Sequence, residues 1–401
     1  MLINSKNSKA ILFVTLLGLV LPPLGNDIYF SSLPSMAHEF KTTHIQLIVS
    51  FYLLGFSLGQ LFYGPLSDRF GRKPLMITAL TMTLLGCVLV LLTHNYSLLL
   101  LARFIQALGS CGILCMALAI IRDSYHKEEI VKVNAVVFAL LGFVPALAPL
   151  LGSYIATYSN WRMDFLLLVV VAALILMSVV LLFSESSPEK NANALDRNVI
   201  IKSYLRLLRN KPYLQFTLVS CFSYAAFFSF ICASPYLLIK PFNLSLTNYG
   251  WILAFNSICV ILTGFLIPWL TKRFEIASLA AVGAVMILAG GVLMLLLNTV
   301  MNLGLYGVII PSFIVFSGVG FIRPTASAGA LTQAPKDITG SASSLFSFLA
   351  FIGGALFSVL GQFAGGSVYR LAVIIVIAGV ATLAAALLAA ASVKRMKLET
   401  L

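Results

Sequence analysis

The sequence contains few charged residues for its length. Asp, Glu, Lys and Arg make up 10% of its 401 residues, whereas soluble globular proteins carry about 25%. The charges are also clustered, and the whole interval 276–322 contains none. A helix that crosses a membrane needs about 20 mostly apolar residues, and the uncharged intervals accommodate twelve such helices. The chain is therefore predicted to be an all-α, polytopic membrane protein.

Residues that support catalysis or ATP hydrolysis are also scarce. The four histidines lie in predicted loops or at predicted helix ends, and the six cysteines lie inside predicted spans. A histidine-based triad, a histidine-ligated metal site within the membrane and a disulfide framework are therefore not expected. No G-x-x-x-x-G-K-[ST] sequence occurs, so a phosphate-binding loop of that type is excluded. We predict that the protein is not an enzyme and uses neither a metal nor a cofactor.

Basic residues outnumber acidic ones, and their positions predict the orientation of the chain. The formal net charge is +13. With both termini in the cytoplasm, 20 of the 26 Lys and Arg residues lie in inner segments, and four lie in outer loops. This asymmetry follows the positive-inside rule. The excess therefore indicates the orientation of a membrane protein whose inner segments contact anionic lipid headgroups, and not a protein that binds nucleic acid.

A polar segment divides the predicted spans six and six. Residues 184–212 are first rich in Ser, Asn, Pro and Glu and then rich in Lys and Arg. We expect an N-terminal half over 1–184, a cytoplasmic linker with a basic amphipathic helix over 185–211, and a C-terminal half over 212–401. The halves show a weak repeat, because LSDRF at 66–70 corresponds to LTKRF at 270–274.

Several motifs resemble those of the major facilitator superfamily. GPLSDRFGRKPLM (64–76) resembles its signature between spans two and three, LLARFIQALGSCG (100–112) its fourth-span motif, and FVPALAPLLGS (143–153) the fifth-span motif of its antiporter branches. NDIYFSSLP (26–34) is similar to the first span of bacterial drug:proton antiporters of the Bcr/CflA group, although Ser31 replaces a proline there. The resemblance covers nearly the whole chain. It implies two six-helix halves and a site between them near the middle of the membrane.

The first motif implies a conformational latch formed by Gly64, Asp68, Arg69, Gly71, Arg72 and Lys73. We expect the glycine at its start to permit close helix approach. Asp68 is expected to pair with Arg72 and with a neighbouring helix N-terminus, a contact that alternating access must break. The alternative is a cytoplasmic charge cluster without a latch function. The fifth-span motif implies close helix packing at Pro145, Pro149 and Gly152.

Asp27 is the one acid that the sequence places well inside a span, whereas the other twelve are assigned to loops or span ends. An acid there costs roughly 2.5–3.5 kcal/mol to insert, so it should face an internal cavity and have a function. Burial favours the protonated form of a carboxyl and a nearby cation favours the charged form. Arg103, at a similar depth in the fourth span, is the candidate cation. We predict proton coupling through both residues, with a permanent structural ion pair as the alternative. Arg323-Pro324 is interpreted as a structural helix break in the tenth span.

Polar and aromatic residues in the spans are predicted to line the substrate site: Asn26, Tyr29, Tyr52, Gln106, Tyr224, Phe228 and Asn256. Aromatic walls with few polar groups suit small amphiphilic organic compounds, although simple packing is the alternative for each aromatic residue. The sequence thus predicts a proton-coupled antiporter that exports such compounds, monomeric by resemblance. Export of an endogenous metabolite or siderophore, or proton-coupled uptake by the same fold, are the alternatives.

Overall fold

The computed structural model describes residues 5–124, 127–183, 185, 195–362 and 367–399. These residues are almost entirely helical and contain no β-strand. Within them, twelve helical segments are long and apolar enough to cross a membrane. The twelve spans predicted from the uncharged intervals are therefore confirmed, and the chain is an all-α, multi-pass membrane protein.

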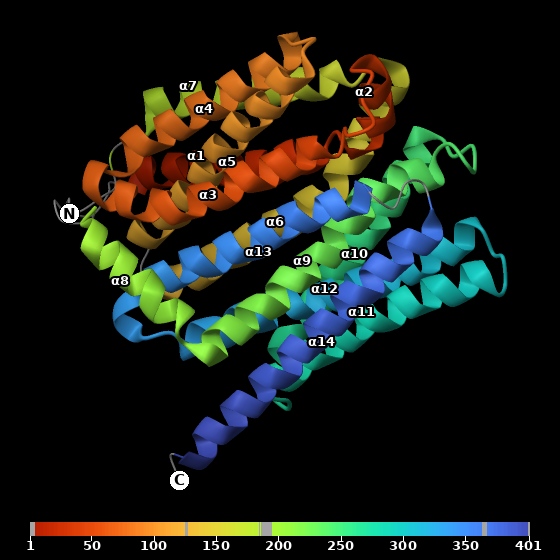
Figure 1. Ribbon diagram of the computed structural model, residues 1–401. Helices are drawn as coiled ribbons and strands as arrows, with labels where there is room; N and C mark the ends of the chain where they lie inside the picture. Colours follow the sequence, from red (N-terminus) through yellow and green to blue (C-terminus); the bar gives the residue numbers. More distant parts are fainter. Residues whose placement is uncertain (1–4, 125–126, 184, 186–194, 363–366, 400–401) are drawn as a thin grey trace. The chain divides into compact units, whose positions relative to one another are not determined.

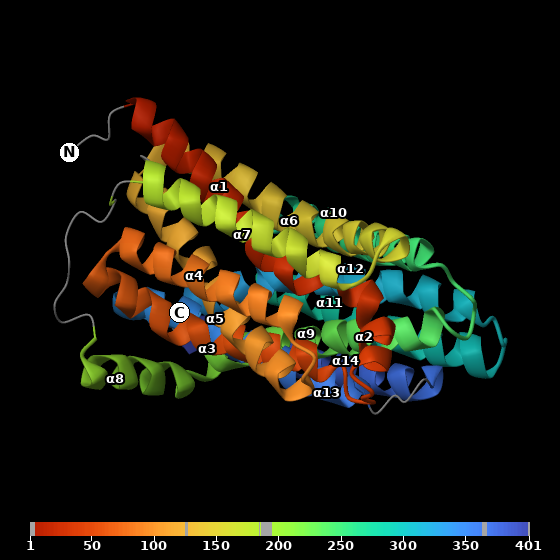
Figure 2. The same ribbon diagram turned by 90° about the horizontal axis from the view of Figure 1, so that it is seen from above.

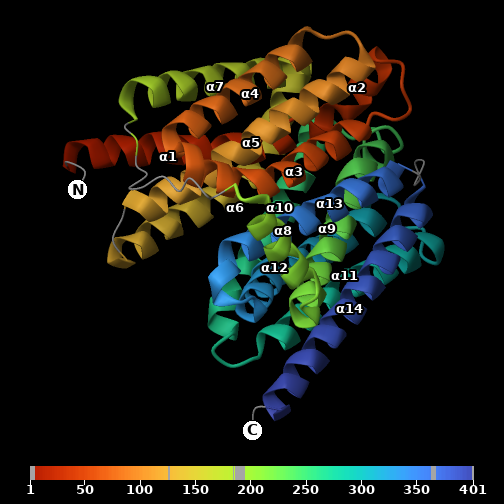
Figure 3. The same ribbon diagram turned by 60° about the vertical axis from the view of Figure 1, so that its left-hand side comes forward.

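The chain divides into two compact units, Met1–Arg197 and Asn198–Leu401 (Figure 1). The first contains α1 (Ser5–Asp27), the 3₁₀ helix η1 (Phe30–Ser32), α2 (Leu33–Glu39), α3 (Leu47–Phe70), α4 (Arg72–Leu92), α5 (Tyr96–Ser124), α6 (Lys127–Tyr158) and α7 (Arg162–Leu182). Then follow α8 (Arg197–Leu208), α9 (Lys211–Leu238), α10 (Leu246–Leu270), α11 (Ile276–Thr299), α12 (Leu305–Gln333), the 3₁₀ helix η2 (Lys336–Ile338), α13 (Thr339–Gln362) and α14 (Val368–Glu399). A turn joins the end of the short helix α8 to the start of α9 (Figure 3). The finer division into two halves and a linker stays a prediction.

The two units share one pattern of helix packing, and the long helices of each run roughly alongside one another (Figure 2). In the first unit, α5 packs against α1, α3 and α4, α7 packs against α1 and α4, and α6 packs against α1. In the second, α12 packs against α9, α10 and α11, α14 packs against α9 and α11, and α13 packs against α9. The main neighbours of each helix therefore correspond to those of its counterpart six spans later, which extends the weak sequence repeat to whole helices.

Small residues permit the closest of these contacts. A Cβ atom at Gly109 of α5 would lie 2.4 Å from the carbonyl oxygen of Ala79 in α4. In the corresponding pair of the second unit, a Cβ at Gly318 of α12 would lie 2.6 Å from the carbonyl oxygen of Gly283 in α11. Because both distances are too short for a carbon atom, glycine is what lets these backbones approach each other, as is common in membrane helices.

The first span is not a continuous helix. Phe13–Glu39 is long and apolar enough to span, but α1 ends at Asp27, and η1 and α2 complete the segment. Asp27, which the sequence places well inside a span, is therefore within the span but at the end of a helix and not in its interior. Pro34 stands in the first turn of α2, where proline favours a helix start because that position needs no hydrogen-bonded N–H. The segment thus restarts its helix after Asp27, close to the middle of the span.

The tenth span is a continuous helix, although the sequence predicts a break in it. α12 runs from Leu305 to Gln333 with Pro324 inside it, so the predicted helix break at Arg323-Pro324 was wrong. Membrane helices tolerate proline where nearby hydroxyl groups and neighbouring helices compensate the altered backbone. Here the hydroxyl of Thr325 donates to the carbonyl oxygen of Phe321 at 2.7 Å. Arg323 is therefore a helical residue on a long span.

Candidate functional site

Arg103 is the centre of a buried polar cluster in the first unit. Its side chain on α5 is fully buried. Nη1 donates to the carbonyl oxygen of Gly25 at 3.1 Å and to Oε1 of Gln106 at 2.5 Å. The guanidinium carbon lies 4.3 Å from the ring centroid of Tyr29 and 4.3 Å from that of Tyr52. Two oxygen acceptors and the faces of neighbouring aromatic rings therefore stabilise the buried cation.

The break after Asp27 supplies one of those acceptors. The last carbonyl groups of an α-helix have no partner within the helix. Here the amide of Ile28 donates to the carbonyl of Leu24 at 3.1 Å, and the carbonyl of Gly25 accepts from Arg103. A cation near a helix C-terminus also interacts favourably with the helix dipole. The end of α1 and the position of Arg103 are thus coupled.

Asp27 lies at this helix end with 8% of its surface exposed. The side-chain amide of Asn26 donates to its carboxylate oxygen Oδ1. Two further nitrogen atoms of Arg103, Nε and Nη2, are buried and have no hydrogen-bond partner among the described residues. A buried carboxyl and a buried cation with spare donors therefore belong to one cluster, whereas the predicted direct pairing of Asp27 with Arg103 stays a prediction.

Six of the predicted site residues come together in this cluster: Asn26, Asp27, Tyr29, Tyr52, Arg103 and Gln106. The hydroxyl of Tyr52 donates to the carbonyl oxygen of Pro22 at 3.0 Å, which ties α3 to α1. Both tyrosine rings are buried and contact Arg103 in this conformation. That these residues bind substrate stays a prediction.

The other predicted substrate residues belong to the second unit. Tyr224 and Phe228 share one face of α9, with ring centroids 6.0 Å apart. Asn256 on α10 is fully buried, and its side-chain oxygen accepts a hydrogen bond from the hydroxyl of Ser312 on α12 at 3.1 Å. Asn256 therefore joins two helices of its own unit, and its predicted contact with substrate stays untested.

Asp164 is a buried carboxyl that sequence reasoning missed. It was assigned to a span end and does stand in the first turn of α7, yet its side chain is fully buried. The hydroxyl of Ser32 donates to Oδ2 at 3.1 Å, and Oδ1 has no hydrogen-bond partner within the described part of the chain. The next residue, Phe165, lies 5.7 Å from the Tyr29 ring. Asp164 therefore borders the Arg103 cluster, and its hydrogen bond with Ser32 of η1 is a contact that no local sequence signal predicts.

Arg72 is the centre of a second cluster, formed by the motif between spans two and three. Its side chain is buried and contacts two carboxylates at 2.9 Å, Nη1 to Asp68 and Nε to Asp123. The predicted Asp68–Arg72 pair is confirmed, whereas the contact with Asp123 at the end of α5 was not predicted. Arg69 instead lies over the ring of Phe70 at 5.6 Å. The cluster thus ties the joined ends of α3 and α4 to the C-terminal end of α5.

The turn at Gly71 completes this second cluster. Gly71 has φ +99°, a conformation that side chains disfavour, and α4 begins at the next residue. The carboxylate of Glu185 accepts from the amide of Arg72 at 2.9 Å and from that of Lys73 at 3.2 Å. A carboxylate suits a helix N-terminus because of the free N–H groups and the helix dipole. Glu185, which the sequence assigns to the linker, therefore caps α4.

Gly152 of the fifth-span motif contacts the break in the first span. A Cβ atom there would lie 1.7 Å from the carbonyl oxygen of Ile28, the residue after Asp27. Pro145 and Pro149 are both inside α6 and precede Gly152 along that helix. The backbones of α6 and of the first span are thus in close contact at this glycine, whereas the packing role of the whole motif stays a prediction.

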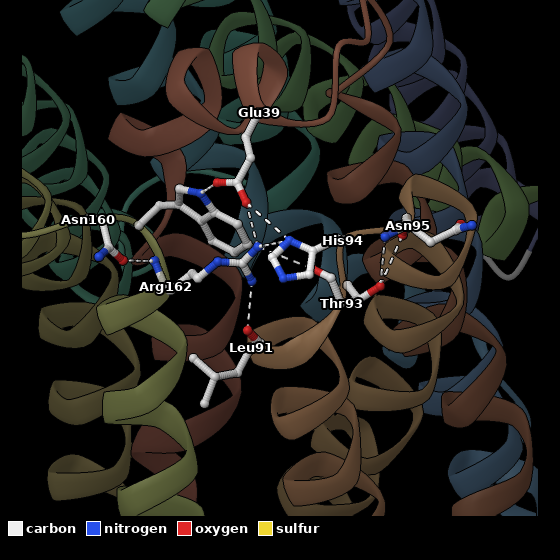
Figure 4. A network of polar contacts seen from close by, with 8 residues as sticks. Glu39, Leu91, Thr93, His94, Asn95, Asn160 and Arg162 are labelled. Carbon is white, nitrogen blue, oxygen red and sulfur yellow. Dashed lines mark hydrogen bonds and ion pairs between the residues drawn. The ribbon is translucent and has the colours of Figure 1, made fainter.

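A third cluster lies at the end of the first unit opposite Arg72, where α4 ends (Figure 4). Arg162 donates to the carboxylate of Glu39 at 2.5 Å and to the carbonyl oxygen of Leu91 at 2.6 Å. Nε1 of Trp161 donates to the other carboxylate oxygen of Glu39 at 2.6 Å, and His94 lies 3.2 Å from Arg162. These contacts hold the ends of α2 and α4 to the start of α7, beside the buried Asp164.

A comparison with known protein families shows which family the chain belongs to. The family named Major Facilitator Superfamily matches residues 15–358. The chain belongs to the Major Facilitator Superfamily. The resemblance expected from the loop, fourth-span and fifth-span motifs is therefore confirmed. Members of this superfamily are transporters, so the chain is a membrane transporter of small molecules and not an enzyme.

Curated relatives of this facilitator carry names from drug resistance. The chain is 25% identical over 361 residues to a bicyclomycin resistance protein homolog of Haemophilus influenzae, covering 89% of the chain and 90% of the relative. It is 26% identical over 363 residues to multidrug resistance protein D of Escherichia coli, covering 89% of each, and 27% identical over 367 residues to multidrug resistance protein MdtL of Klebsiella pneumoniae, covering 90% of each. These relatives agree with the resemblance to the drug:proton antiporter group.

The fold of this facilitator is also that of solved transporters. The structure of the peptide transporter POT in complex with sulfate superposes with a TM-score of 0.78, covering 96% of this chain and 94% of that chain. The two sequences are 15% identical, so this likeness shows the fold alone.

Proposed function

We propose that the protein is a proton-coupled antiporter that exports small amphiphilic organic compounds by alternating access. The relatives named for bicyclomycin and multidrug resistance support the substrate class. The bacterial relatives support a location in the inner membrane, and the distribution of Lys and Arg supports an orientation with both termini in the cytoplasm. The observation that carries the proposal is the buried Asp27 at the break of the first span, beside the backbone group that binds Arg103.

Asp27 is the proton carrier in this proposal. When Asp27 loses its proton, the carboxylate is attracted to Arg103, whose Nε and Nη2 have donors to offer. When it gains a proton, that attraction disappears and Arg103 keeps its contacts with Gly25 and Gln106. Because Asp27 ends a helix, it can change its contacts without disrupting hydrogen bonds inside a helix. Proton loading is thereby linked to the conformation of the first span.

The Arg72 cluster is the conformational latch. Its contacts with Asp68 and Asp123 hold the ends of α3, α4 and α5 together. Charge-assisted hydrogen bonds to a buried guanidinium are strong, so they stabilise one arrangement of these ends. Alternating access needs a second arrangement, and the cluster is the part of the first unit that must then rearrange.

The test is proton flux in inverted membrane vesicles that respiration has acidified inside. A panel of neutral and charged amphiphilic drugs is added to vesicles with the wild type, Asp27→Asn or the control Asp337→Asn. Asp337 is an exposed acid in η2 that pairs with Arg206, so its substitution should leave the flux unchanged. We expect a compound to alkalinise wild-type and control vesicles but not those with Asp27→Asn. Equal flux in all three would remove Asp27 from the proton path.

A further inference from the structure

Arg323 is a cation within a span of the second unit, and the mechanism proposed above does not use it. It lies on α12 ten residues before the helix ends at Gln333, which corresponds to about 15 Å along the axis at 1.5 Å per residue. Charged side chains at such depth are costly, and they usually face a partner, a cavity or a substrate pathway. Arg323 is half-buried, so a partner or a function is expected for it.

Aromatic rings form the surroundings of Arg323. Its guanidinium carbon lies 4.9 Å from the ring centroid of Tyr224 and 5.3 Å from that of Phe227, both on α9. Tyr224 in turn contacts Phe351 at 5.1 Å, and Phe227 contacts Phe316 at 4.9 Å. These ring faces attract a cation, but they do not replace oxygen acceptors for all its N–H groups. Nε is buried without a hydrogen-bond partner in the described residues.

The second unit has no acid placed to neutralise this charge. From residue 198 onward the sequence contains three acids: Glu275, Asp337 and Glu399. The first precedes α11, the second lies in η2, and the third is the last residue of α14, so each stands at a helix end or between helices. Arg103, by contrast, has two oxygen acceptors from its own unit. The positive charge of Arg323 is therefore not neutralised by an acid of its own unit.

We propose that Arg323 binds the carboxylate of the transported compound, with Tyr224 and Phe227 against the aromatic or apolar part of that compound. A guanidinium has a planar set of donors that matches a carboxylate, and aromatic side chains with few polar groups accept varied apolar bodies. The substrate class is then the amphiphilic organic anions. This inference rests on the proposed transport function and specifies its substrate.

The test uses three probes with one ring system and different charges. They are 9-anthracenecarboxylate, its methyl ester and 9-anthracenylmethylammonium, titrated by fluorescence against the purified full-length protein in detergent. We expect the wild type to bind the carboxylate about tenfold more tightly than the ester, as a charge-assisted hydrogen bond provides, and to bind the ammonium least. Arg323→Gln should remove the preference for the carboxylate while affinity for the ester stays within about twofold, because the rings remain. Arg323→Lys should retain part of the preference, because it keeps the charge but not the planar donors.

The matched control is Arg273→Gln. Arg273 follows α10, lies over Trp269 at 5.3 Å and is exposed, so its substitution should leave all three affinities unchanged. The inference is overturned if the wild type binds the ester or the ammonium as tightly as the carboxylate, if it fails to bind the carboxylate, or if Arg323→Gln keeps the preference. The vesicle assay is independent of this result. If proton flux is lost in Asp27→Asn but the wild type shows no preference for the carboxylate, antiport is supported and the role of Arg323 is refuted. If the wild type prefers the carboxylate but Asp27→Asn keeps its proton flux, only antiport through Asp27 is refuted.

Discussion

Substituting Gly152 by alanine tests whether α6 positions the break that carries Asp27. The new Cβ would lie 1.7 Å from the carbonyl oxygen of Ile28, whereas ordinary carbon–oxygen contacts are about 3.3 Å long. The two backbones must therefore separate by about 1.6 Å. Because the obstacle is a backbone atom, no side chain can rotate away to relieve the contact. Overpacking of this kind costs typically about 1–3 kcal/mol of unfolding free energy.

Gly264→Ala is the matched control for this substitution. Gly264 is also inside a long helix, α10, but the nearest atom to its added Cβ is the carbonyl oxygen of Gly320 at 3.8 Å. Both variants gain about 1 kcal/mol of helix propensity, so this contribution cancels in their difference. We expect Gly152→Ala to be less stable than Gly264→Ala by about 1–3 kcal/mol, measured by thermal unfolding of the detergent-solubilised protein, and to show reduced proton flux. Equal stability and flux in both variants would refute the packing argument.

Two further predictions concern the other clusters of the first unit. Asp164→Leu should lower the unfolding free energy by about 1–3 kcal/mol, because the buried hydroxyl of Ser32 loses its acceptor. Asp164→Asn keeps an oxygen there and should lower the unfolding free energy less in the same assay. Equal losses in the two variants would contradict the assigned hydrogen bond. Arg72→Lys should slow substrate-elicited proton flux although the charge is kept, since lysine cannot donate to Asp68 and Asp123 from one planar group. Wild-type flux in Arg72→Lys would show that the two-carboxylate geometry is not required for the latch.

The spans and the local contacts could be predicted from the sequence. The twelve spans follow from the spacing of charges, because the thickness of a bilayer sets the length of an uncharged helix. The Asp68–Arg72 pair follows from two residues four positions apart in a recognisable motif. The shared face of Tyr224 and Phe228 follows from helical periodicity. Each of these features depends on residues that are close together along the chain.

Only the tertiary structure decided which groups are buried and what they contact. Arg103 donates to the carbonyl oxygen of Gly25 where α1 ends at Asp27, and the buried Asp164 accepts a hydrogen bond from Ser32 of η1. Glu185 caps α4, although more than a hundred residues separate Glu185 from the start of that helix at Arg72. Such contacts join segments that are distant in the sequence, and they depend on where a helix is interrupted. Hydropathy and spacing determined that the chain crosses the membrane twelve times, whereas the partners of its buried charges were determined by how those helices pack.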